Sequence, residues 1–279
     1  MLRYSYNTNG FAHHRLEDAV EILRELGYEG IGLTPDVHHL DPFRTEVGEL
    51  RRWRKTLHGL EIVIQTGARF LLDSRRKHEP TLLSEDKEER AVRRLFLEKA
   101  IEMGEILKAT AVSFWSGRAP AGADEEELWD RLEMECRPLC LRAQRAGLKL
   151  AFEPEPGMWI ERVEGYEELR DRLAHPSFAL ALDVGHLACT GESLTEVLSR
   201  CGSEIAIVQI EDIRGAVHEH RMFGEGDLNF AEILGAFTNA GYAGLLECEL
   251  SRDSHRAVEC ATRARTYLRG VEQALEPHR

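Results

Sequence analysis

The stretch of residues 149–186, KLAFEPEPGMWIERVEGYEELRDRLAHPSFALALDVGH, decides the fold class. It begins and ends with short apolar runs, Lys149–Glu153 and Phe178–Asp183, which suit buried β-strands. Between them, Tyr166–Leu173 repeats its apolar residues at spacings of three and four, which is typical of an amphipathic helix. This order predicts a β-α-β unit, in which a helix joins two parallel strands.

The same unit recurs along the chain on both sides of this stretch. The strands are predicted at Leu2–Tyr6, Gly30–Thr34, Glu61–Thr66, Thr110–Trp115, Lys149–Glu153, Phe178–Asp183, Glu204–Ile210 and Leu245–Leu250. The helices are predicted at Leu16–Leu26, Phe43–Leu57, Glu89–Leu107, Glu126–Ala146, Tyr166–Leu173, Leu194–Cys201, Phe230–Ala240 and Ser254–Ala274. Eight such units predict an α/β fold, a single (β/α)8 TIM barrel, and the absence of a linker predicts one domain over residues 1–279.

The composition restricts the class of protein. With 36 Lys and Arg against 49 Asp and Glu, the net charge is −13, which disfavours nucleic acid as a partner. The N-terminal residues MLRYSYNTNGFAHH lack the apolar core of a signal peptide, and no run approaches the roughly 20 apolar residues of a membrane span. We therefore expect a cytoplasmic protein with no membrane partner, and leave homo-oligomerisation open.

Acidic side chains gather at the C-terminal ends of the last four predicted strands, the end at which TIM-barrel enzymes carry their chemistry. The polar residues at these ends are Glu153, Glu155, Asp183, His186, Gln209, Glu211, Asp212, Glu247 and Glu249. Unpaired carboxylates that converge repel one another and lose hydration, so we expect a cation to compensate them. Oxygen-rich ligation favours one divalent metal ion, Mg²⁺, Mn²⁺ or Co²⁺ before Zn²⁺.

Further polar and aromatic side chains are expected around the same barrel mouth. His218 and His220 follow the seventh strand, and they could bind a metal, contact a substrate or lie exposed in a loop. His38 follows the second strand, and Trp115 closes the fourth. An aromatic ring beside hydroxyl-binding groups suits a small sugar or polyol. The sequence therefore predicts a small-molecule, sugar-like substrate.

One expected ion pair follows from the spacing of two acids. Glu247 and Glu249 are two residues apart on one strand, so they share one side of the sheet. If Glu249 faces a metal, Glu247 faces inward one layer deeper, where a lone carboxylate is costly. We expect Glu247 to pair with Arg3 of the neighbouring first strand; the alternative is that the register turns Arg3 outward beneath a helix.

Four segments carry a likeness to a known family. They are LAFEPEPG at 150–157, ALDVGHL at 181–187, FGEGDLNF at 223–230 and GYAGLLECELSRDSH at 241–255. In these segments the sequence resembles the xylose isomerase-like TIM barrels, which include sugar isomerases and epimerases, inosose dehydratases and endonuclease IV. The likeness covers nearly the whole chain and is specific for the superfamily, but not for a substrate.

The ketose 3-epimerase branch of that family holds one metal ion with Glu, Asp, His and Glu from strands five to eight, and its two glutamates move the proton. The positions that match these ligands are Glu153, Asp183, Gln209 and Glu249. The resemblance implies Glu153 and Glu249 as the catalytic acid and base, and His186 and Arg214 as substrate contacts. Gln209 departs from the usual histidine, and an amide oxygen is a weaker donor than imidazole.

The resemblance implies a metal-dependent sugar isomerase or epimerase that works through an enediolate. The first alternative is a metal-dependent lyase that eliminates water after the same enolisation. An endonuclease IV-like hydrolase is suggested by His218-Glu-His220 before Gly224-Glu-Gly226, but Gln65 and Phe114–Ser116 stand where that branch carries further histidines. A non-catalytic sugar-binding barrel is the last alternative, if Gln209 marks a lost metal site.

Overall fold

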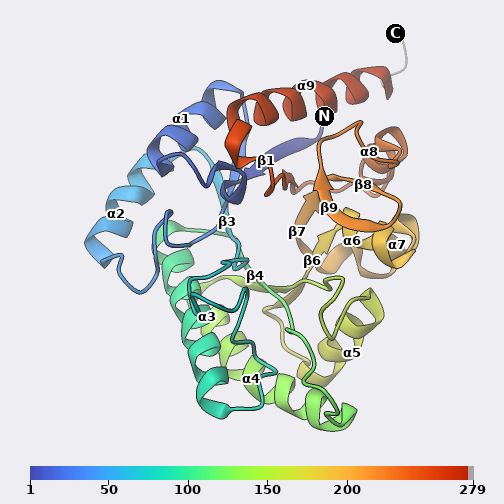
Figure 1. Ribbon diagram of the computed structural model, residues 1–279. Helices are drawn as coiled ribbons and strands as arrows, with labels where there is room; N and C mark the ends of the chain where they lie inside the picture. The colour runs from blue at the N-terminus through green and yellow to red at the C-terminus, as the bar shows by residue number, and fades with distance from the viewer. Residues whose placement is uncertain (276–279) are drawn as a thin grey trace.

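A closed barrel of eight parallel strands forms the centre of the computed structural model, which describes residues 1–275. Helices surround the barrel (Figure 1). The strands follow one another around the barrel in the order β1-β10-β7-β6-β5-β4-β3-β2. Their bounds are β1 Arg3–Asn7, β2 Gly30–Leu33, β3 Glu61–Ile64, β4 Ala111–Phe114, β5 Lys149–Phe152, β6 Phe178–Asp183, β7 Ile205–Ile210 and β10 Leu245–Cys248. The predicted (β/α)8 fold is confirmed.

The helices pack their apolar faces against the outside of the barrel. Their bounds are α1 Leu16–Glu25, α2 Val47–Thr56, α3 Lys87–Leu107, α4 Glu125–Ala146, α5 Val163–Leu173, α6 Val184–Thr190, α7 Leu194–Cys201, α8 Phe230–Asn239 and α9 Ala257–Leu275, with short 3-10 turns at Thr8–Phe11, Gly202–Glu204 and Ser254–Arg256. Each predicted helix is present. The sequence missed α6, a short helix whose first four residues are buried. Every helix within residues 1–275 is too short or too polar to span a bilayer.

A two-stranded antiparallel hairpin follows β7, where the sequence predicted only a loop. It consists of β8 (Asp212–Arg214) and β9 (Val217–Arg221). Gly215 and Ala216 turn the chain with φ angles of 60° and 57°, and two consecutive left-handed residues are typical of a tight hairpin turn. Because alternate residues of a strand share one face, β9 presents His218 and His220 on the same side.

The barrel interior is narrow at its base and polar above it. Val63, Ala111, Ala151, Ala181 and Ile207 form a small apolar cluster that is separate from the larger core between strands and helices. Above this cluster, Gln65 donates from Nε2 to Glu247 Oε1 at 2.7 Å. The polar layer therefore lies at the C-terminal end of the strands, where the chain can build a site.

The predicted ion pair between Arg3 and Glu247 is wrong. The register pairs Arg3 with Leu245 and Ser5 with Glu247, so Arg3 lies two residues nearer the base of the barrel. Its Nη2 atom is 2.9 Å from Glu61 Oε2, and 43% of its side chain is exposed. Glu247 takes an amide partner instead, and burial together with nearby Glu249 raises its pKa well above the usual range. A protonated carboxyl avoids the cost of a buried lone charge.

Gly32 makes room for the Glu247 carboxyl group. A Cβ atom on Gly32 would lie 2.0 Å from Glu247 Oε2. We expect Gly32→Ala to lower the free energy of unfolding by about 1–3 kcal/mol, because the carboxyl group must shift within a packed interior. Urea unfolding checks this value. The matched control is Gly235→Ala in α8, where a Cβ meets nothing within 4 Å and stability should stay equal or rise. Equal stability of both variants would contradict the close packing at Gly32.

Candidate metal and catalytic site

A cavity of about 230 Å³ opens at the C-terminal ends of the strands. Most of the side chains predicted from the sequence line it, namely Trp115, Glu153, His186, Gln209, His218, His220 and Glu249. Asp183 is buried at the end of β6, beside this cavity, and lies 3.8 Å from His186. The fold therefore brings the four predicted metal ligands and the two predicted catalytic glutamates to one end of the barrel.

Two predicted substrate contacts do not reach this cavity. Arg214 is exposed at the tip of the β8–β9 hairpin, where it pairs with Val217. His38 is exposed as well, and its ring lies 4.6 Å from that of His39. Neither side chain lines the cavity, so their role as substrate contacts stays a prediction that this structure does not support. Arg214 is held at the turn of the hairpin, whereas His218 and His220 on β9 reach the cavity.

The end of β6 sets the position of His186. Asp183 caps α6, and its Oδ1 atom accepts from the His186 backbone N–H at 2.9 Å. Nδ1 of the His186 ring lies 3.0 Å from the Pro154 carbonyl oxygen, a contact that assigns the ring proton to Nδ1. The lone pair on Nε2 then points toward the cavity. Asp183 Oδ2 is buried without a hydrogen-bond partner, which leaves it free to bind a cation.

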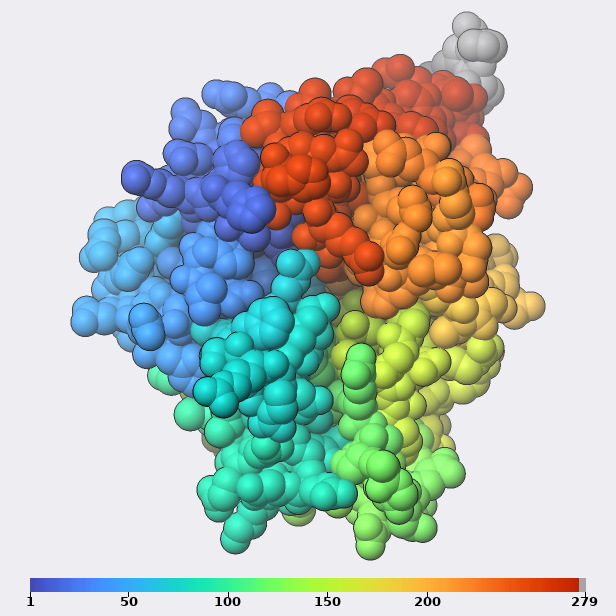
Figure 2. Space-filling view, viewed as in Figure 1, coloured from blue at the N-terminus to red at the C-terminus, as the bar shows by residue number. Residues whose placement is uncertain are grey.

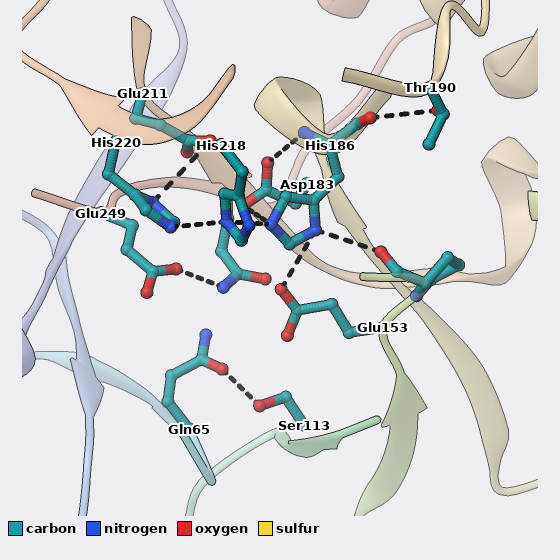
Figure 3. A network of polar contacts seen from close by, with 12 residues as sticks. Gln65, Ser113, Glu153, Asp183, His186, Thr190, Glu211, His218, His220 and Glu249 are labelled. Atoms are coloured by element: carbon teal, nitrogen blue, oxygen red, sulfur yellow. Dashed lines mark hydrogen bonds and ion pairs between the residues drawn. The ribbon is translucent and has the colours of Figure 1, made fainter. Parts of the chain in front are cut away.

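Three imidazole rings meet beside Asp183 (Figure 3). His218 Nε2 lies 3.0 Å from His186 Nε2 and 2.9 Å from His220 Nε2. Burial lowers the pKa of His186 and of His220 to about 4, and that of His218 to about 3, so the rings are neutral at pH 7. A neutral ring nitrogen carries at most one proton, so His218 Nε2 cannot donate to both neighbours. This arrangement suits nitrogens that share a metal ion, because two ligands at 2.0–2.1 Å from one ion lie roughly 3.3 Å apart in tetrahedral geometry.

Glu249 is held between two amides. Gln209 Nε2 donates to its Oε2 at 2.5 Å, and Asn9 Nδ2 donates to its Oε1 at 2.8 Å. Burial and the nearby Asp183 raise the pKa of Glu249 to about 7. Burial, together with Glu155 and Glu249, raises the pKa of Glu153 well above its usual range. The pKa values of both predicted catalytic glutamates are thus raised, which favours the protonated form of each.

The side chains gathered around Asp183 fit a divalent metal ion. Ligand atoms lie within 4.8 Å of one another in the groups His186, His218 and His220; Glu153, Asp183 and His186; and Asp183, His220 and Glu249. Gln209 Oε1 is buried without a partner, so the amide oxygen is also available. Carboxylate and amide oxygens with neutral imidazoles suit Mn²⁺, Co²⁺ and Zn²⁺.

Glu211 is a further buried carboxyl group beside this site. Both of its oxygens are buried without a hydrogen-bond partner, and Oε1 lies 3.9 Å from His220 Nδ1, which also has no partner. Burial and Asp183 raise its pKa well above the usual range. At this distance the two groups are neighbours without a hydrogen bond. Its position after β7 was visible in the sequence, but its neighbour on β9 was not.

The Gly224-Glu-Gly226 turn packs on a carboxylate of the chain itself. Asp212 accepts from the backbone N–H groups of Gly224 at 2.8 Å, Gly226 at 2.9 Å and Leu228 at 3.1 Å. A Cβ on Gly226 would lie 2.2 Å from Asp212 Oδ1. The close approach that these glycines allow is therefore to Asp212, which anchors the segment after the hairpin.

Residues 20–275 match the model of the xylose isomerase-like TIM barrel, and the chain belongs to this family. Among the curated relatives, the inosose dehydratase of Clostridium perfringens is 27% identical over 163 residues, 52% of this chain and 55% of that protein. The putative hydroxypyruvate isomerase of Danio rerio is 25% identical over 168 residues, 55% of this chain and 58% of that protein. The aligned region thus spans about half the length of each relative.

Solved structures share the fold over nearly the whole chain. The D-allulose 3-epimerase of Methylomonas sp. superposes with a TM-score of 0.78 at 16% identity, covering 97% of this chain and 98% of the other. The IOLI protein, solved with a bound zinc atom, superposes with a TM-score of 0.79 at 17% identity, covering 99% of this chain and 100% of the other. At these identities the likeness shows a common barrel.

The buried carboxyl groups predict a pH dependence of the metal-free protein. Folded-state pKa values of about 7 for Glu249 and about 8 for Glu155, against 4.5 for an exposed carboxyl group, mean that the folded chain holds more protons than the unfolded chain. Stability that is present at low pH is then lost as the pH rises through these values. The site histidines have lowered pKa values and act in the opposite direction, but only below their ordinary value of 6.5.

We therefore expect the free energy of unfolding in EDTA to fall by about 1–2 kcal/mol between pH 6.5 and 8. Urea unfolding at both pH values measures it, and Mn²⁺ should remove the slope by compensating the carboxylates. Glu249→Gln is the matched variant, because an amide does not titrate and should flatten the curve. A pH-independent stability of the metal-free protein would show that these carboxyl groups are ionised in the folded chain.

Proposed function

We propose that this chain is a metal-dependent isomerase or epimerase of a small sugar or polyol-type carbonyl compound. The observation that carries the proposal is the placement of Glu153 and Glu249, which approach one cavity from the ends of β5 and β10 (Figure 3). Two carboxyl groups on opposite sides of a bound molecule can remove a proton from one face of a carbon and return one to the other. Relatives named as isomerases, epimerases and dehydratases support this class of chemistry.

The proposed ion is one divalent metal, held by Glu153, Asp183 and Glu249 together with Gln209 Oε1 or a histidine. His220 and His186 are both placed for this, because a nitrogen of His220 lies within 4.8 Å of ligand atoms of Asp183 and Glu249, and one of His186 within the same distance of Glu153 and Asp183. Bound there, a divalent cation supplies Lewis-acid polarisation of a carbonyl oxygen and lowers the pKa of the adjacent C–H group. The same cation would compensate the acidic floor of the cavity, which consists of the carboxyl groups of Glu153, Asp183, Glu247 and Glu249.

The protein residues would divide the proton transfer between them. One glutamate must arrive ionised and the other protonated, which requires that their pKa values differ. Glu249 has the lower value of the two, at about 7, because Gln209 and Asn9 donate to its carboxylate. We assign Glu249 as the base and Glu153 as the acid in the forward direction. Trp115 and His186 line the cavity and would contact the substrate.

A dehydratase is the second candidate function, because inosose dehydratases are among the curated relatives. It would use the same proton abstraction and then expel a hydroxyl group from the neighbouring carbon. Mass spectrometry separates the two functions: an epimer keeps the mass of the substrate, whereas elimination lowers it by one water. An endonuclease-like reaction is disfavoured, because Gln65 and Phe114–Ser116 stand where that branch carries histidines.

Glu153→Gln and Glu249→Gln are each expected to slow proton exchange about 10²–10⁴-fold, because each removes one acid–base group. NMR in D2O with Mn²⁺ and a set of ketoses measures deuterium entry next to the carbonyl. The control is Glu219→Gln on the outer part of the hairpin, which should retain the exchange rate. Circular dichroism verifies the folds. Wild-type exchange rates in both site variants would exclude this assignment.

Gln209→His is expected to tighten Zn²⁺ binding about tenfold or more and Mn²⁺ binding less, because imidazole is the better donor for later first-row ions. His220→Ala should weaken both. Isothermal titration measures the affinities and the stoichiometry. If Gln209→His changes nothing while His220→Ala abolishes binding, the imidazole of the hairpin has taken the place of the residue from β7. Wild-type protein that binds neither ion would instead favour a non-catalytic barrel.

A further inference from the structure

Four cationic side chains surround the mouth of the cavity. Arg69 and Lys77 come from the segment between β3 and α3, Arg118 follows β4, and Arg252 follows β10. All four line the cavity that also holds the acidic floor. In Figure 2 the segments that carry them, coloured cyan, green and red-orange, meet around the hollow near the centre of the face. We call these four residues the cationic rim.

Three of the four members of the cationic rim lack a counter-charge at ion-pair distance in the described part of the chain. Within residues 1–275, the side chains of Arg69, Lys77 and Arg118 have no carboxylate at ion-pair distance, and Arg252 Nη1 reaches Glu219 Oε1 only at 3.9 Å. Some cations of the same segment do have partners: Arg76 contacts Asp73 at 2.7 Å. What distinguishes the rim from other surface cations is that its four members line one cavity.

Backbone contacts hold two members of the rim in place. Arg69 Nη2 donates to the Ser251 carbonyl oxygen at 3.0 Å, and Arg252 Nη2 donates to the His218 carbonyl oxygen at 2.9 Å. Each contact uses one donor group of a guanidinium that has five N–H bonds, so most donors stay free. Guanidinium groups that are already fixed before a ligand arrives lose less conformational entropy when they bind it. The rim thus has the form of a prepared anion site.

The like charges of the rim lie close enough to disfavour one another. Partial burial and the neighbouring Arg69, Arg252 and Arg118 lower the pKa of Lys77. Glu155, which lines the same cavity, opposes this effect on Lys77. An anion bound between the cations would relieve their repulsion.

We propose that the cationic rim binds an anionic group, a carboxylate or a phosphate ester, at the end of the substrate remote from the reacting carbons. This inference rests on the proposed function, because it assigns the substrate class of the same site: an acidic keto sugar in place of a neutral one. The floor would take the carbonyl and hydroxyl oxygens, and the rim would take the charged end. The molecule would then enter with one defined orientation.

The alternative role of the rim is to compensate the floor carboxylates. The contacts favour the anion site, since the floor groups take their hydrogen bonds from amides, with Gln209 and Asn9 on Glu249 and Gln65 on Glu247. If the rim compensates the floor, removing its charges should change the affinity for neutral and anionic ligands alike. If the rim is an anion site, removing its charges should weaken the binding of anionic ligands only.

Calorimetric titration of three probes tests the proposal: D-fructose, D-fructose 6-phosphate and 5-keto-D-gluconate. With Mn²⁺-loaded wild-type protein, we expect at least one of the two anionic ketoses to bind about tenfold or more tightly than D-fructose, with an affinity that falls as salt is added. Preference for the phosphate ester or for the carboxylate identifies the anion. Equal affinity for all three probes, or no binding of either anionic ketose up to about 10 mM, would overturn the proposal.

The double variant Lys77→Gln/Arg118→Gln should lose about tenfold in affinity for the preferred anionic ketose and less than about twofold for D-fructose. Arg75→Gln is the matched control, because Arg75 is exposed in the same segment and does not line the cavity. An equal loss for neutral and anionic probes would assign the rim to the floor carboxylates instead. Titrations in EDTA test whether the preference for anionic ketoses needs the metal, and the NMR experiment tests proton exchange. A preference for anionic ketoses together with no metal-dependent proton exchange would support the rim and reject the proposed function.

Discussion

The concentration of buried carboxyl groups at one end of the barrel is the constraint on which the rest of the site depends. Glu153, Asp183, Glu211, Glu247 and Glu249 share this end and are all at or near full burial, apart from Glu249 at the cavity surface. Charges that lose water and face like charges must be protonated, hydrogen-bonded or compensated by a cation. The surrounding structure supplies each of these. Amides of Gln and Asn donate to the deeper and central carboxylates, and neutral imidazoles face the others.

The β8–β9 hairpin (Asp212–Arg221) brings further polar groups to these buried carboxyl groups from outside the barrel strands. It lays His218 and His220 over Asp183, where the inward face of β7 offers only the amide of Gln209. Asp212 at its base accepts hydrogen bonds from backbone N–H groups of the following turn, and so fixes the hairpin relative to that turn. A donor that a strand does not supply can in this way be supplied by a loop, because ligation depends on where an atom lies and not on which element carries it.

The cavity therefore has two zones of opposite charge within one small volume. The acidic floor suits a divalent cation and the proton transfers of an enolisation, while the cationic rim suits an anion. Because the two zones lie in different parts of the cavity, they would fix the orientation of a bound molecule. A substrate with hydroxyl and carbonyl oxygens at one end and an acid at the other would satisfy both, and would place its reacting carbons between Glu153 and Glu249.

The sequence by itself determined the eight β-α units and the residues that end each strand, including Glu153, Asp183, Gln209 and Glu249. These follow from local periodicity, because a buried strand is read over a few residues and its last polar side chain marks the mouth. Only the tertiary structure decided the partners. Strand register moved Arg3 to Glu61 and joined Glu247 to Gln65, the hairpin carried Arg214 away from the site, and loops distant in sequence assembled the rim. Contacts of this kind depend on register and loop path, which no local pattern encodes.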